Sequence, residues 1–182
     1  LMEHRLNAFA QMQAGNFEDA VHYYKLALEE DPENGYLLSF LGDAYHGLGD
    51  LAEAIAQYEL AAEKEATDYT LLYSLGQLYE EAEDIDQAVA QYIKAAELVP
   101  NDIFTLLTLY YNVTALERWE DAKAIEKLIE EFQERQNAFL QEQAATESAE
   151  GEAEELPELV EEAEELPEEE PAESAAESVP ED

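Results

Sequence analysis

The side chains capable of acid–base or metal chemistry lie along the sequence without the spacing of an active site. The three histidines are His4, His22 and His46, and none has a second histidine three or four positions away. A helical zinc site needs that spacing, because it places two imidazoles on one face. The nearest approach is the pair Asp43 and His46, which we interpret as part of a helix surface. We therefore expect no metal site.

The sequence also lacks the motifs of a catalytic nucleophile and of a phosphate-binding loop. The 182 residues contain no cysteine, and no serine lies in a Gly-x-Ser-x-Gly motif. The seven glycines are scattered, and Gly47 and Gly49 lie in a predicted turn between helices. The many carboxylates are best explained as a solvated surface, since nothing in the sequence gathers them into a pocket. We predict that the chain is not an enzyme and has no cofactor.

The charge excludes a further class of function. Asp and Glu number 46 against 8 Lys and Arg, which gives a net charge of −38. A chain of this charge repels the phosphate backbone, so we expect no nucleic-acid partner. The longest apolar run, residues 103–116, is interrupted by polar residues and is shorter than the ~20 residues of a membrane span, so we expect no membrane association. The lack of cysteine and of a visible signal peptide predicts a cytoplasmic location.

A motif recurs along the chain with a constant offset of 34 residues. Its four copies are residues 15–20, 49–54, 83–88 and 117–122. Other positions repeat at the same offset: Tyr24, Tyr58 and Tyr92; Ala27, Ala61 and Ala95; Gly42 and Gly76; Tyr45 and Tyr79. A fixed period of this length is the mark of a repeat protein in which each unit packs only on its neighbours.

Each unit contains two stretches of helical periodicity separated by a turn. In the second unit, Leu38, Leu41, Tyr45 and Leu48 form one apolar stripe. Residues able to cap helices precede the predicted helices: Asn16, Asn34, Asp50, Asp68, Asp84 and Asp102. Gly42 and Gly76 lie within helices, where glycine costs about 1 kcal/mol relative to alanine. We expect them to allow close packing against Ala54 and Ala88 of the partner helices.

The period and these marks resemble the tetratricopeptide repeat family over residues 1–136. The resemblance implies an all-α, right-handed superhelical solenoid of antiparallel helix pairs. The repeats span about 1–34, 35–68, 69–102 and 103–136, and a closing helix completes the domain 1–145. The Glu/Ala/Pro-rich residues 146–182 contain 17 of the acidic side chains and no aromatic one, and we predict that they are disordered.

In this family the first helix of each pair lines a concave groove that binds a peptide or a helix of a partner protein. The corresponding residues here are Arg5, Phe9, Tyr36, Phe40, Asp43, Tyr73, Gln77, Phe104 and Tyr111. The same correspondence places Ser39 and Leu107 in the lining. An alternative is that some of the set, Tyr36 and Leu107 especially, pack between repeats. The resemblance predicts an adaptor or scaffold that binds an apolar or basic segment.

Members that bind the C-terminal tails of Hsp70 or Hsp90 clamp a carboxylate with Lys, Arg and Asn side chains. The matching positions here are Arg5, Phe9, Phe40, Thr70 and Ser74, of which one is basic. We therefore expect that such a tail is not the ligand.

The acidic C-terminal segment supports a second functional hypothesis. It repeats the sequence Glu-Ala-Glu-Glu-Leu-Pro-Glu at residues 152–158 and 162–168. It is a solubilising extension, an acidic chaperone-like segment that binds basic client proteins, or an autoinhibitory segment that occupies the groove. The second interpretation is the alternative to groove binding as the main function.

Overall fold

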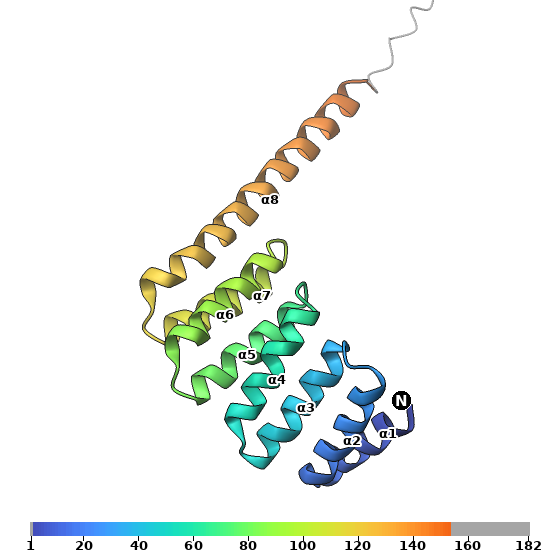
Figure 1. The fold of residues 1–182 in the computed structure, drawn as a ribbon. Coiled ribbons are helices and arrows are strands. Elements are labelled where there is room, and N and C mark those ends of the chain that lie inside the picture. Colours follow the sequence, from blue (N-terminus) through green and yellow to red (C-terminus); the bar gives the residue numbers. More distant parts are fainter. Residues whose placement is uncertain (1, 154–182) are drawn as a thin grey trace, which may run out of the picture. The chain divides into compact units, whose positions relative to one another are not determined.

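The computed structural model describes residues 2–153, and within that range it contains α-helices and no strand. The helices are α1 (Met2–Ala14), α2 (Phe17–Glu30), α3 (Gly35–Leu48), α4 (Leu51–Lys64), α5 (Tyr69–Glu81), α6 (Ile85–Leu98), α7 (Ile103–Ala115) and α8 (Trp119–Ala153). From α1 to α7, each helix lies beside the next in chain order (Figure 1). The predicted all-α solenoid of helix pairs is confirmed.

The chain divides into two units, the first of which spans Leu1–Gln141. The first contains all seven shorter helices and most of α8. The sequence predicted that the closing helix ends near residue 145, but α8 continues to Ala153. Residues 146–153, predicted to be disordered, are therefore helical. The remainder of the predicted disordered segment, 154–182, lies outside the described residues.

Side-chain caps stabilise the helix starts, although not at every predicted position. The capping side chain accepts a hydrogen bond from the backbone of its helix at Asn34, Asp68, Asp84 and Asp102. The expectation was wrong for Asn16 and Asp50, whose side chains make no such bond. The amide of Asn16 instead donates to Oε1 of Gln11 at 2.8 Å, which joins it to the preceding helix.

Paired helices meet where a glycine of the first helix faces a tyrosine of the second. A Cβ atom added to Gly42 would lie 2.6 Å from Cδ2 of Tyr58, and one added to Gly76 would lie 2.6 Å from Cε1 of Tyr92. The aromatic rings lie closest at both positions. The expected approach of the partner backbone is confirmed for Ala54 at Gly42, whereas the nearest atoms at Gly76 all belong to Tyr92 and not to Ala88. The backbone oxygen of Ala54 lies at 3.3 Å from the Gly42 position.

These tyrosines reach across their helix pairs to carboxylates. The hydroxyl of Tyr58 donates to Oδ1 of Asp43 at 2.6 Å, and that of Tyr92 donates to Glu80. Burial raises the pKa of Asp43, and the hydrogen bond from Tyr58 opposes this rise only in part. Burial is also the main reason why the pKa values of Tyr58 and Tyr92 are raised. Both phenols are therefore neutral donors at physiological pH.

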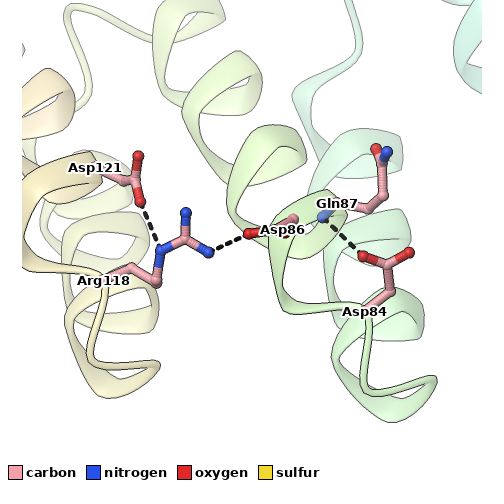
Figure 2. A network of polar contacts seen from close by, with 5 residues as sticks. All are labelled: Asp84, Asp86, Gln87, Arg118 and Asp121. Carbon is pink, nitrogen blue, oxygen red and sulfur yellow. Dashed lines mark hydrogen bonds and ion pairs between the residues drawn. The ribbon is translucent and has the colours of Figure 1, made fainter.

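An ion-pair network joins α8 to α6 (Figure 2). Arg118 occupies the position held by Asp84 one repeat earlier, and it cannot cap a helix because it is not an acceptor. Its Nε donates to Oδ2 of Asp121 at 2.7 Å, and its Nη1 donates to Oδ1 of Asp86 at 2.5 Å. Arg118 thus spans the starts of two helices that lie 34 residues apart in the sequence.

The substitution Gly76→Ala should destabilise the array by about 1–2 kcal/mol, because overpacking costs about 1–3 kcal/mol and the helix propensity of alanine offsets about 1 kcal/mol of this. Urea unfolding followed by circular dichroism measures the change. The control Gln77→Ala lies one position along the same helix and is exposed, so its effect should stay within about 0.5 kcal/mol. A Gly76→Ala variant as stable as the parent would contradict the close glycine–tyrosine contact.

The substitution Asp43→Asn should stabilise the protein at neutral pH. The folded state raises the pKa of Asp43, so this carboxyl binds protons more readily when folded and its contribution to stability falls as the pH rises through that pKa. Asparagine keeps an oxygen that accepts from Tyr58 and carries no charge to desolvate.

Thermal unfolding of the two proteins at neutral and acid pH measures this effect. The melting temperature of Asp43→Asn should exceed that of the parent at neutral pH, and the difference should vanish in acid. Asp50→Asn controls for the loss of one negative charge, because Asp50 is exposed and makes no side-chain cap bond. Equal gains in the two variants would refute the burial effect.

Candidate protein-binding groove

The residues predicted to line a groove come from the first helix of each pair, α1, α3, α5 and α7. Phe9, Phe104 and Tyr111 expose 59%, 81% and 71% of their surface, which leaves three large aromatic side chains largely in solvent. Tyr73 is half-buried, and Arg5, Tyr36, Phe40 and Gln77 are exposed. Asp43 is also exposed as a residue, but its carboxylate is partly desolvated where Oδ1 accepts from Tyr58. Monomeric proteins rarely expose apolar side chains in such a set without a binding partner.

The first pocket of this surface is apolar and lies between α1, α2 and α3. Its volume is about 690 Å³, and its walls are Met2, Arg5, Leu6, Phe9, Tyr24 and Phe40. It brings together three of the predicted residues, Arg5, Phe9 and Phe40. Sequence reasoning missed Tyr24, whose ring stacks on Phe40 with the centroids 5.9 Å apart. Its recurrence at the 34-residue period marked Tyr24 as structural but not as part of the groove.

A second pocket lies between α5 and α7 and has a volume of about 320 Å³. Its lining is formed by Tyr69, Thr70, Tyr73, Phe104, Thr105, Thr108 and Leu109. It brings together two predicted residues, Tyr73 and Phe104. The ring of Tyr73 also packs on that of Tyr92, at 5.7 Å between centroids, so the buried core supports this wall.

A polar pocket of about 320 Å³ lies between α3, α4 and α5. Its walls are Asp43, His46, Tyr58, Ser74, Gln77, Leu78 and Glu81. Two predicted residues, Asp43 and Gln77, meet here. Nε2 of His46 lies 2.7 Å from Oε2 of Glu81, which joins the first helices of neighbouring repeats. The pocket therefore presents carboxylates, an imidazole and an amide between the two apolar pockets.

The other predicted lining residues lie outside these three pockets. Tyr36 and Leu107 expose 48% and 47% of their surface, and a side-chain hydrogen bond to Asp68 raises the pKa of Tyr36. Tyr111 is also outside them. Ser39 was expected in the groove, but it is 5% exposed and its hydroxyl donates to the backbone oxygen of Tyr36. This hydrogen bond lies within its own helix, so Ser39 does not present its hydroxyl to a ligand.

Two properties of the described residues limit the chemistry of the site. Among residues 2–153, no group of three or more His, Asp or Glu side chains is arranged to hold a metal ion. In the same range, every helix is too short or too polar to cross a bilayer.

Comparison with family models gives two matches to the tetratricopeptide repeat. One covers residues 7–70 and the other covers residues 69–102. Together they span the first three helix pairs, in agreement with the 34-residue period of the sequence. No curated protein sequence matches the chain significantly.

Solved structures share the fold at low sequence identity. A crystal structure of MamA has a TM-score of 0.55 and 20% identity, over 72% of this chain and 77% of its own. The first TPR of Spaghetti (RPAP3) bound to the HSP90 peptide SRMEEVD has a TM-score of 0.55 and 21% identity, over 64% of this chain and 92% of its own.

The Yersinia enterocolitica type III secretion translocator chaperone SycD has a TM-score of 0.52 and 18% identity, over 75% of this chain and 86% of its own. At such identity these likenesses concern the fold alone. The family matches, the repeat period and the fold agree, and the chain belongs to the tetratricopeptide repeat family.

Proposed function

We propose that this tetratricopeptide repeat protein, an interaction adaptor by its fold, binds a peptide or helix of a partner protein along α1, α3, α5 and α7. The observation that carries the proposal is the set of exposed aromatic side chains on α1, α3 and α7, which the half-buried Tyr73 continues on α5. Aromatic side chains in pockets supply most of the binding energy of typical interfaces. The mechanism is stoichiometric and non-catalytic: apolar side chains of the partner displace water from the two apolar pockets.

The pockets define the chemistry of the ligand. The two apolar pockets accept aliphatic or aromatic side chains, and the polar pocket between them presents Asp43 and Glu81. A basic residue between two apolar anchors complements this pattern, because opposite charges attract and like charges are excluded. The partner segment is therefore apolar with a basic centre.

The same chemistry disfavours the C-terminal tails of Hsp70 and Hsp90. Arg5 is the one cation in the lining of the two apolar pockets, and Phe9 and Phe40 surround it. One guanidinium beside aromatic rings is a poor clamp for a terminal carboxylate, since such clamps use several charge-assisted hydrogen bonds. The Spaghetti domain binds an HSP90 peptide, and we propose a different class of ligand for this chain.

The second candidate function assigns binding to the acidic C-terminal residues. Residues 154–182 carry acidic side chains and no basic one, a composition that attracts basic proteins over long distances. In this alternative, the helical array is a scaffold for an acidic chaperone. We propose a cytoplasmic location for either function, supported by the absence of cysteine from the sequence.

Replacing Phe9, Phe40 and Phe104 together with alanine should abolish capture of the partner. Each buried aromatic anchor contributes ~2 kcal/mol or more, so one substitution alone should weaken binding about 30-fold. The assay compares proteins retained from source-cell lysate by the parent and by the variant, then measures the affinity of the identified partner by calorimetry. Circular dichroism first establishes that the variant is still helical.

A matched control replaces Trp119 and Phe139, which expose 61% and 54% of their surface and line none of the three groove pockets. This control should retain the partner. If the groove variant retains it as well, the groove is not the binding site. A chain truncated after Ala153, assayed at low and moderate salt, then tests the alternative: binding through the acidic residues should disappear, whereas groove binding should be insensitive to screening.

A further inference from the structure

A cavity of about 610 Å³ opens on the side of α5 that faces away from the groove. It lies between α4, α5 and α6, and α5 contributes Leu72, Leu75 and Tyr79 to it. The groove residues of the same helix include Tyr73 and Gln77. At about 3.6 residues per turn, these two sets lie on opposite sides of the helix. The cavity is therefore separate from the site proposed above, and its volume is typical of a ligand pocket.

Gln91 is the feature of this cavity that the fold does not explain. Its side chain is 6% exposed and lines the cavity, and within the described residues its amide has no hydrogen-bond partner. The other repeats place Tyr23, Gln57 and Ile125 at this position, and Ile125 is completely buried. Its polar atoms are not sealed from solvent, so water in the cavity reaches them where no protein partner does. The amide of Gln91 is thus available to a group that enters the cavity.

Negative charge surrounds the opening of the cavity. Glu59 and Glu63 of α4 and Glu97 of α6 contribute carboxylates, and Lys94 contributes one cation, so the excess is two negative charges. The hydroxyl of Tyr79 donates to Oε1 of Glu59 at 2.5 Å, which fixes this carboxylate over the cavity. An entering cation would meet a preorganised acceptor and would not have to order it.

The interior of the cavity is aliphatic. Leu72, Leu75 and Leu98 line it together with the small residues Ala62 and Ala66. Leu98 is 38% exposed, so the apolar surface continues from the interior to the rim. An occupant that matches both parts has an apolar stem and a cationic, hydrogen-bonding end.

We infer that this cavity is a second protein-binding site and receives an arginine side chain of a partner. The aliphatic stem of arginine packs on the leucines, and its planar guanidinium reaches the carboxylates and the amide oxygen of Gln91. Lysine fits less well, because its compact and strongly hydrated ammonium does not form bidentate bonds. The site is independent of the groove, so neither proposal depends on the other.

The test titrates the full chain with N-acetyl-arginine methylamide while nitrogen–proton correlation spectra are recorded. Backbone amides of α4 and α6 and the side-chain amide of Gln91 should shift in a saturable manner. The matching citrulline compound has the same shape without the charge, and it should bind about two- to fivefold more weakly, as expected for loss of an exposed ion pair. Equal binding of the two compounds would overturn the inference.

Two variants and a control separate this site from general attraction to an acidic chain. Glu63→Gln should weaken binding of the arginine probe by about threefold. Glu53 is exposed on the same helix and lies outside the cavity, so Glu53→Gln should leave this binding unchanged. Gln91→Leu should weaken binding of the probe, because it removes the amide oxygen that accepts a hydrogen bond from the guanidinium. If Glu63→Gln and Glu53→Gln weaken the probe equally, the attraction is non-specific and the site does not exist.

A last experiment tests whether the bound arginine belongs to a peptide segment rather than to a free amino acid. A short capped peptide with a central arginine flanked by leucines should bind more tightly than the single capped amino acid, because its leucines also contact the apolar rim. A peptide no tighter than the amino acid would contradict a protein partner. The same titration with the Phe9, Phe40 and Phe104 variant should be unchanged, which keeps the failure of one site distinct from failure of the other.

Discussion

The close approach of two helices within each pair is the constraint on which the array depends. Where Gly42 and Gly76 leave room for the rings of Tyr58 and Tyr92, one aromatic side chain fills the interface and its hydroxyl bonds a carboxylate of the first helix. Ala8 holds the equivalent place in the first pair and is completely buried. The fourth pair has Tyr110 at this position, so its two helices do not meet through a small residue. The hydrogen-bonded ion pair between Arg118 and Asp86 links this pair to the third.

This packing determines where the two proposed binding surfaces lie. Because small residues and tyrosines fill the space inside the first three pairs, the first helices keep a free side toward the groove. The second helices, α4 and α6, leave the cavity between them on the opposite side of α5. Tyr73 packs on the core residue Tyr92, so a wall of the groove is supported by the same aromatic ring that closes the helix pair.

The period of the sequence predicted the helix pairs because small and aromatic residues recur where backbones must meet. It did not distinguish a capping side chain from a residue that merely precedes a helix, as Asn16 shows by bonding Gln11 instead. Nor could spacing identify Tyr24 as a pocket wall or Gln91 as an unpaired amide, because both depend on which neighbouring helix comes near. The sequence analysis predicted the end of α8 too early, because alanine and glutamate have high helix propensity even without apolar residues to bury.

The repetition of one joint has a consequence for how such an array changes length. An Asn or Asp cap precedes each of the units 35–68 and 69–102, and both contain the same glycine–tyrosine contact. Each unit therefore has nearly the same packing within its helix pair. A duplicated copy of such a unit would make the same packing contacts with the units before and after it, and the terminal pairs would be unchanged. Copy number is thus a variable that genetic duplication can alter without redesigning any interior contact, and it sets how long a ligand the surface can span.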